Sequence, residues 1–195
     1  MSDHPVSGIS LHLFDDASSA PPRDEAVWQS GMSLDDFIAQ VTIHLELWQT
    51  TRRLAHISEA QTARAAALRG PLSLLVLTED WCGDAIHTLP FVARLVEANP
   101  AITMRLVKRD EHDAIMATHL SGVSRSIPVV IAYDAAGRER GWWGPRPSPL
   151  QAWVKAEGLA LEKTERYKRI RTWFARDRGV TTTDEVLALL THADR

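Results

Sequence analysis

The chain has 195 residues, of which 45% are apolar and 24% are charged, a balance typical of a globular protein. Its formal net charge of −3 excludes a global electrostatic surface for nucleic acid or for anionic membranes. A single cysteine, Cys82, excludes an intramolecular disulfide, so the fold does not require an oxidising compartment.

No targeting or membrane-spanning segment is expected. The first residues lack a basic region followed by an apolar run, and no apolar run approaches the ~18 residues of a membrane span. We therefore expect a cytoplasmic protein with no membrane partner and no nucleic acid partner.

The N-terminal part predicts a lead-in followed by helices. Residues 1–30 have little periodicity and predict a poorly ordered segment, with a short docked piece at 9–14. Ser33 and Asp36 form a capping pattern for one helix whose apolar stripe runs from Leu34 to Trp48. Ser58 and Gln61 cap a second helix, which Gly70-Pro71 would end.

From residue 71 to about 147 the pattern alternates strand and helix, as in an α/β layer fold. It predicts strands at 72–77, 102–107, 129–133 and 139–142, and helices at 83–98 and 111–119. The last two strands form a hairpin in which Gly137 supplies the positive φ. Trp142 and Trp143 would point to opposite faces of a strand, which predicts that one of them is exposed.

The C-terminal part, residues 148–195, predicts three more helices. Gly158 and Gly179 would end the first two, and Thr182 and Glu185 would cap the last. Basic side chains on the middle helix are interpreted as a solvated face, without the aromatic interleaving of a nucleic acid site: Arg166, Lys168, Arg169, Arg171, Arg176 and Arg178.

The only cysteine lies where a buried apolar strand passes into a helix. The sequence there is Trp81-Cys82-Gly83-Asp84-Ala85. Unpaired backbone N–H groups and the helix dipole favour a negative charge at such a junction. This predicts a thiol that ionises more easily than a free one, and the thiolate is the reactive form.

These residues resemble the Trp-Cys-Gly-x-Cys turn of the thioredoxin-like superfamily, with Ala85 in place of the second cysteine. Pro90 and the Ile127-Pro128 pair stand where that superfamily has a helix proline and a cis-proline facing the active-site turn. The chain is also similar to a bacterial subgroup of thioredoxin family proteins, through three further motifs: Arg109-Asp110-Glu111, Ser124-Arg125-Ser126-Ile127-Pro128 and Trp143-Gly144-Pro145-Arg146-Pro147.

The resemblance implies a single thioredoxin-like domain over 31–195, with a core at about 71–147 and helical extensions at 31–70 and 148–195. It implies Cys82 as the catalytic residue. Trp81, Gly83 and Asp84, with Arg125, Ile127 and Pro128, would bind the substrate.

Several positions depart from a dithiol reductase. Ala85 removes the cysteine that resolves a mixed disulfide. Where thioredoxins have a buried aspartate and a nearby lysine, alignment places Val76 and Leu106. The chain therefore does not resemble a simple dithiol enzyme.

Three hypotheses for Cys82 remain open, and they leave enzymatic activity undecided. The favoured one is a monothiol that forms mixed disulfides with a protein or a low-molecular-weight thiol, although the charge of Asp84 opposes the thiolate. The second is a redox-inactive protein-binding module that reuses the thioredoxin groove. In the third, Cys82 is a buried apolar residue.

Few cofactors fit this pattern. The positions of His87, His112 and His119 match no zinc signature, so no metal is expected. No resident cofactor is expected either, although glutathione is a possible co-substrate. Arg125 would then bind a carboxylate at the rim of the groove, or else be an exposed loop arginine. The sequence leaves the oligomeric state open.

Overall fold

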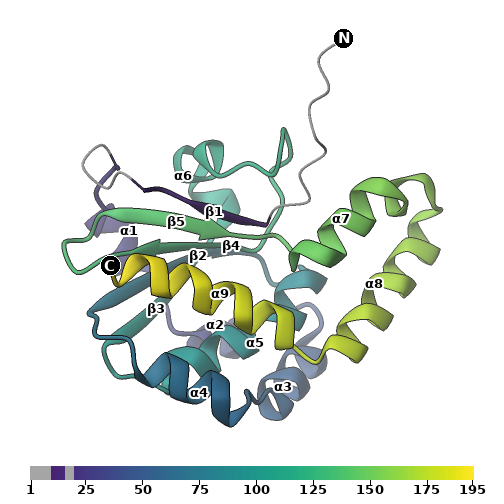
Figure 1. Ribbon diagram of the computed structural model, residues 1–195. Coiled ribbons are helices and arrows are strands. Elements are labelled where there is room, and N and C mark those ends of the chain that lie inside the picture. The colour runs from purple at the N-terminus through teal and green to yellow at the C-terminus, as the bar shows by residue number, and fades with distance from the viewer. Residues whose placement is uncertain (1–9, 16–19) are drawn as a thin grey trace.

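In the computed structural model, which describes residues 10–15 and 20–195, five strands form one mixed sheet with the order β1-β5-β4-β2-β3 (Figure 1). The strands are β1 (Leu11–Leu13), β2 (Leu72–Thr78), β3 (Ile102–Lys108), β4 (Val129–Tyr133) and β5 (Glu139–Trp143). The helices are α1 (Glu25–Ser30), α2 (Leu34–Gln40), α3 (Leu45–Leu54), α4 (Glu59–Ala66), α5 (Gly83–Glu97), α6 (Asp113–Thr118), α7 (Ser148–Ala156), α8 (Lys163–Asp177) and α9 (Val180–Ala193), with 3-10 turns η1 (Arg109–Glu111) and η2 (Gly158–Ala160).

The centre of the sheet is β2, in which every residue is buried. It pairs in parallel with β3 and antiparallel with β4, so its backbone is hydrogen-bonded on both sides. A run of apolar residues suits a strand that is covered on both faces, and the predicted strands lie within a residue of those observed. The apolar pair Val76 and Leu106 lies in register across β2 and β3, and both are fully buried.

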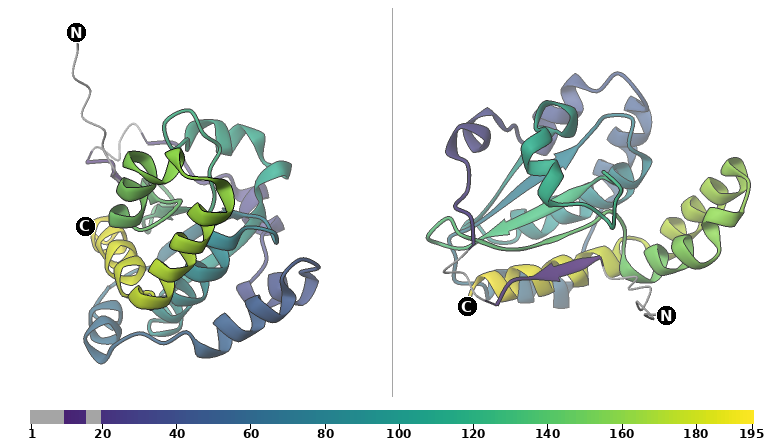
Figure 2. Two further views of the ribbon diagram at one scale, coloured as in Figure 1. Left: turned by 90° about the vertical axis from the view of Figure 1, so that its right-hand side faces the viewer. Right: turned by 90° about the horizontal axis from the view of Figure 1, so that it is seen from above.

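Helices cover the sheet on both sides. The long helices α5 and α9 pack against each other, and α9 lies against β4 and β5. The short helix α6 lies on the far side of the sheet from α9 (Figures 1 and 2). The apolar faces of α5 and α9 join the strands in one large core.

The single helix predicted to begin at Ser33 is two helices, α2 and α3. The chain leaves helical geometry between them, and His44 there has a positive φ of 63°. Thr42 explains the break, because both its backbone N–H and its hydroxyl donate to the Asp80 carboxylate. The predicted cap at Ser58 is confirmed, as a full capping box with Gln61.

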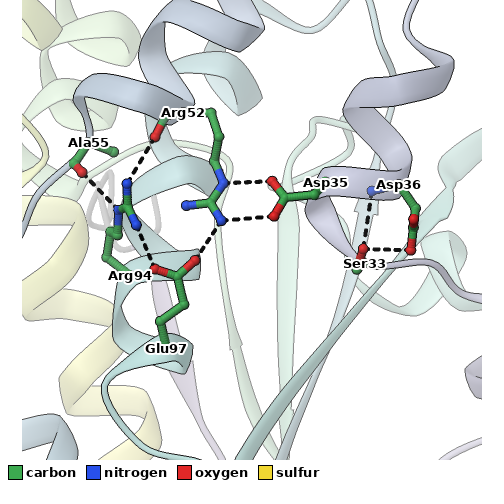
Figure 3. A network of polar contacts seen from close by, with 7 residues as sticks. All are labelled: Ser33, Asp35, Asp36, Arg52, Ala55, Arg94 and Glu97. Atoms are coloured by element: carbon green, nitrogen blue, oxygen red, sulfur yellow. Dashed lines mark hydrogen bonds and ion pairs between the residues drawn. The ribbon is translucent and has the colours of Figure 1, made fainter.

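An ion-pair network joins these helices to the core (Figure 3). The Arg52 guanidinium on α3 donates two hydrogen bonds to Asp35 of α2, at 2.8 and 3.0 Å, and a third to Glu97 of α5. Arg94 also contacts Glu97, at 2.7 Å, and donates to the backbone carbonyl oxygens of Ala55 and Arg52. These contacts fix α2 and α3 against α5.

The prediction of a poorly ordered lead-in over residues 1–30 is wrong for the part that the structure describes. Strand β1 pairs antiparallel with β5, and the Asp24 side chain caps α1 by accepting from the N–H of Val27. Met32 then exchanges two backbone hydrogen bonds with Leu106 of β3. The docked piece predicted at 9–14 agrees with β1, although Ile9 lies outside the described residues.

Both tryptophans of β5 are buried, so the prediction that one would be exposed is wrong. Trp143 is fully buried and its Nε1–H donates to the Glu185 carboxylate of α9 at 2.6 Å. Trp142 is only 5% exposed and stacks on His12 of β1, with ring centroids 3.8 Å apart. The face of the strand that carries Trp142 is covered by two ring side chains, His12 of the neighbouring strand β1 and His119, which packs edge-on at 5.8 Å between centroids.

Beyond β5, helices α7 and α8 form a hairpin that projects from the body as an arm (Figures 1 and 2). The arm has an apolar cluster separate from the main core, formed by Leu150, Val154, Ile170 and Phe174. Gly179, with a φ of 78°, then begins α9, in place of the predicted cap at Thr182, which is buried within the helix. In the described residues, no helix is long and apolar enough to cross a membrane.

Candidate functional site

The thiol of Cys82 occupies the junction between β2 and α5. Cys82 is the N-cap of α5, and its Sγ accepts a hydrogen bond from the Ala85 N–H at 3.5 Å. The Sγ–H in turn donates to the Ile127 carbonyl oxygen, 3.4 Å away. The peptide bond between Ile127 and Pro128 is cis. The turn around Cys82 and the Ile-Pro loop are thus brought together through the sulfur atom.

The turn that precedes Cys82 is held by the N-terminal helices. The indole N–H of Trp48 donates to the Asp80 carbonyl oxygen at 2.9 Å, and Trp48 is fully buried. Thr42 holds the carboxylate of the same aspartate. On the other side, Glu79 accepts from the Asp110 backbone N–H at 3.0 Å. The extension at residues 31–70 therefore positions the turn directly.

The prediction of an easily ionised thiol is wrong. Cys82 is only 5% exposed, and burial, followed by the nearby charge of Asp84, raises its pKa to about 12. The helix N-terminus acts in the predicted direction, because the N–H groups of Ala85 and Asp84 lower the pKa, but desolvation is the larger effect. The hydrogen bond to the Ile127 carbonyl also holds the sulfur in its protonated form, since only the thiol donates.

Asp84 forms a buried ion pair with Arg146, which follows β5. The carboxylate and guanidinium are 2.6 Å apart, and the two side chains are 9% and 15% exposed. Burial raises the pKa of Asp84, while the charge and the hydrogen bond of Arg146 act against that rise. The Arg146 guanidinium also donates to Gln151 of α7, at 3.0 Å. Arg146 thus joins α5 to the base of the arm.

A cleft of about 560 Å³ opens beside the thiol. The turn around Cys82, the loop before β4 and helix α8 form most of its wall, with single residues from the break before α3, from η1 and from the chain after β5. The lining residues are His44, Trp81, Cys82, Gly83, Asp84, Arg109, Ser124, Arg125, Ser126, Ile127, Arg146, Lys163, Tyr167 and Arg171. Six of the seven predicted site residues are therefore brought together. Pro128 is buried beneath the cleft and does not line it.

Two of the predicted residues form the rim. The Trp81 ring is 44% exposed, and the Arg109 guanidinium lies over it, 5.1 Å from the centroid. Arg125 is half-exposed and pairs with Asp113 of α6. Arg109 connects the two, because it donates to the Arg125 carbonyl oxygen at 3.1 Å. This rim is flat, aromatic and cationic.

Sequence reasoning missed the basic part of the cleft. Arg109 and Arg146 stand within the quoted motifs, but the motifs indicate no role for either, and the sequence predicts Arg171 on a solvated face. Helix α8 contributes Lys163, Tyr167 and Arg171, spaced four residues apart on one face. That spacing was a readable signal for a common face, but nothing local indicates that the face lies toward Cys82.

In the part of the chain that the structure describes, no group of three or more His, Cys, Asp or Glu side chains could hold a metal ion. His87 packs on Phe174 of α8 with ring centroids 5.0 Å apart, and His119 contacts Glu139 at 2.9 Å, away from the thiol.

Comparison with known proteins agrees with this architecture. A family model described as Thioredoxin matches residues 31–175. The chain belongs to the thioredoxin family. The predicted thioredoxin-like α/β fold is thereby confirmed.

Two crystal structures are similar to this thioredoxin-family chain. A protein of unknown function from Pseudomonas aeruginosa superimposes with a TM-score of 0.67 at 19% identity, over 85% of this chain and 95% of that one. An HIV epitope-scaffold superimposes with a TM-score of 0.67 at 17% identity, over 86% of this chain and 96% of that one. At these identities the likeness shows the fold alone. No curated protein matches the sequence.

This thioredoxin-family site therefore combines a protonated, helix-capping thiol with a cation-rich cleft. The thiol can donate one hydrogen bond and accept another. The cleft can bind an anion or a polar segment beside the sulfur, since cationic and hydroxyl groups outnumber its apolar ones.

Proposed function

We propose that this thioredoxin-family chain is a binding module, in which the cleft beside Cys82 receives a partner without thiol–disulfide exchange. The observation that carries this proposal is the burial of the thiol, which is 5% exposed and donates to the Ile127 carbonyl oxygen. With a pKa of about 12, only about one thiol in 10⁵ is ionised at pH 7, against about 3% for a free thiol of pKa ~8.5. The concentration of the nucleophilic thiolate is therefore about three thousand times lower than for a free thiol.

The residues around the sulfur support the same conclusion. Cys82 is the only cysteine, and Ala85 stands where a dithiol enzyme has its second. The apolar contact of Val76 with Leu106 stands where the resemblance implies a proton-transferring pair. The Cys82 sulfur instead supports the helix, because it caps α5 as a Ser or Asp side chain would.

The second candidate is monothiol redox chemistry, which the position of Cys82 in the wall of an open cleft favours. In that mechanism the Cys82 thiolate attacks one sulfur of a disulfide, forms a mixed disulfide and releases the other sulfur as a thiolate. A second thiol, such as glutathione, then attacks the mixed disulfide and restores Cys82. This route needs a change that lowers the pKa of Cys82, such as a movement that exposes the sulfur.

Alkylation of Cys82 by iodoacetamide, followed by intact mass against pH, distinguishes the two candidates. We expect slow modification at pH 7 and a rate that still rises above pH 10, while the denatured chain reacts with the midpoint of a free thiol. The Cys82→Ser variant controls for modification at other residues.

Incubation with glutathione disulfide provides a second readout. We expect no mixed disulfide on the native chain within the time in which the denatured chain is fully modified. Rapid alkylation with a midpoint below about pH 8, or a stable adduct with glutathione on the folded protein, contradicts the proposal and supports the monothiol mechanism.

A further inference from the structure

The cleft beside Cys82 is strongly cationic, although the whole chain has a net charge of −3. Five of its lining residues are arginine or lysine, namely Arg109, Arg125, Arg146, Lys163 and Arg171, and only Asp84 is acidic. Such a concentration of one charge in a concave site raises the local concentration of anions.

The cations of the body already have carboxylate partners. Arg146 pairs with Asp84 inside the cleft, whereas Arg109 and Arg125 pair with Asp110 and Asp113. Neither of these last two carboxylates lines the cleft, and their side chains are 59% and 74% exposed. The pair of Arg125 is exposed on both sides and therefore weak. Arg109 is less exposed but lines the cleft as Arg125 does, so both guanidinium groups can contact a ligand there.

The cations of the arm have no such partner. Within residues 10–15 and 20–195, no carboxylate lies within ion-pair distance of Lys163 or Arg171. Their neighbour Arg169 differs, because it is held by Glu165 at 2.8 Å on the same helix. Two unpaired cations on one face of α8 thus point into a cleft that already contains three guanidinium groups.

The arm holds these two charges in place opposite the body. Helix α8 packs on α7 through its separate apolar cluster, and the Phe174 ring stacks on His87 of α5. Lys163 and Arg171 are eight residues apart, which separates their Cα atoms by about 12 Å along the helix. One small ion with a single acidic group would not neutralise both side chains as well as a longer ligand with two such groups.

We propose that the cleft binds a small organic anion with two or more acidic groups, held between Lys163 and Arg171 of α8 and the guanidinium groups of the body. The cavity of about 560 Å³ lies within the usual range of ~300–1,000 Å³ for small-molecule sites. Carboxylate and phosphate both suit arginine, which binds them in a bidentate manner. This inference rests on the proposed binding function and names the class of ligand.

Calorimetric titration of the full chain with citrate and with tripolyphosphate tests the proposal for the two acid chemistries. We expect at least one of them to bind with a Kd of about 1 mM or lower, while acetate at the same ionic strength gives no binding. The Lys163→Glu/Arg171→Glu variant should bind at least about tenfold more weakly, a change equivalent to about 1.4 kcal/mol.

Helix α8 offers a matched control in Lys168→Glu/Arg176→Glu. This variant changes the same number of charges, eight residues apart on the same helix, but both side chains line a separate pocket and neither lines the cleft. We expect it to bind as the unchanged protein does. Should the cleft variant fail to fold by circular dichroism, Lys163→Gln/Arg171→Gln tests the same contacts without reversing the charge.

The absence of binding by both polyanions up to about 10 mM overturns the proposal. Equal weakening in the two charge-reversal variants also overturns it, since that would indicate attraction by the whole molecule. The Cys82→Ala variant separates this inference from the proposed function. Retained anion binding in that variant, together with rapid alkylation of the native thiol, would remove the proposal of a redox-inactive module and leave the anion site in place.

Discussion

At the scale of single residues, the environment of the sulfur decides the chemistry more than the motif does. Cys82 stands at a helix N-terminus, which lowers the pKa of a thiol, but it is also buried and close to Asp84. Desolvation has the larger effect, and the sulfur therefore caps the helix as a neutral donor and acceptor. In an exposed turn, the same sequence over residues 81–85 would lower the pKa of the cysteine thiol, because the helix N-terminus would act without the desolvation.

Replacing Asp84 by asparagine should lower the pKa of Cys82, because the substitution removes a negative charge that opposes the thiolate and leaves the Arg146 charge beside it. A fall of one pKa unit would increase the alkylation rate about tenfold at a fixed pH below the midpoint. Asparagine still accepts a hydrogen bond from Arg146, so the fold should persist.

The pH profile of alkylation measures this effect. Asp113→Asn provides the control, because it removes a charge from an exposed ion pair with Arg125 outside the cleft. An unchanged midpoint in Asp84→Asn, with the fold intact, would show that burial alone sets the pKa of the thiol.

At the scale of elements, close backbone contacts decide how the edge of the sheet is closed. Gly141 of β5 has a φ of 144°, and a Cβ atom there would collide with the His12 carbonyl oxygen of β1. Gly137 of the same hairpin also has a positive φ, of 71°, but a Cβ atom there would contact nothing. One glycine is thus required by a neighbouring strand, and the other only by its own turn.

Gly141→Ala should therefore displace β1 and reduce the free energy of unfolding by about 2–4 kcal/mol, whereas Gly137→Ala should cost about 1 kcal/mol through backbone strain alone. Denaturant unfolding measures both changes. Hydrogen exchange should show faster exchange at residues 11–13 in Gly141→Ala only. Equal losses of stability in the two variants would contradict this account of the β1 contact.

The sequence predicts elements well where the pattern is local. The apolar run of β2, the helical spacing of α5 and the turn at Gly137 led to the observed strands, helix and hairpin within a residue or two. The break between α2 and α3 could not be predicted in this way, because it depends on Thr42 binding to Asp80, 38 residues away. The prediction of an exposed tryptophan in β5 was wrong for the same reason, since His12, which covers Trp142, lies far earlier in the chain.

The candidate site follows the same division. The sequence brought Trp81, Cys82 and Asp84 together through one motif, and Ile127 through a second. It could not place Lys163 and Arg171 in the same cleft, because helical spacing defines a face but not the surface that the face meets. Nor could it decide among the three hypotheses for Cys82, because the burial of the thiol depends on elements that pack around the turn.

At the scale of the whole molecule, partly buried histidines make stability depend on pH. Burial, and then the charge of Arg171, lowers the pKa of His87, and burial likewise lowers that of His12. The unfolded chain therefore takes up these protons near pH 6.5, before the folded chain does. The folded state is therefore most stable above that pH, and the free energy of unfolding falls as the pH drops through the lowered pKa values.

Replacing His87 by phenylalanine should make the free energy of unfolding fall less steeply between pH 7 and pH 5. The substitution removes one titrating group and keeps an aromatic ring against Phe174. Urea unfolding at several pH values measures the slope. An undiminished slope in His87→Phe would show that other groups govern the acid sensitivity.

The N-terminal segment has a consequence for the molecule as a whole. It pairs with β5 through β1, meets the β4–β5 hairpin at Pro22, and reaches the opposite side of the sheet, where Met32 bonds to β3. One stretch of chain thus pairs along β5 on one side of the sheet and contacts the edge strand β3 at one bridge on the other. A shortened chain without this segment would expose unpaired backbone groups along β5 and β3, at opposite edges of the sheet. Pairing through two such edges can continue into an open filament, whereas pairing through a single edge ends with a dimer.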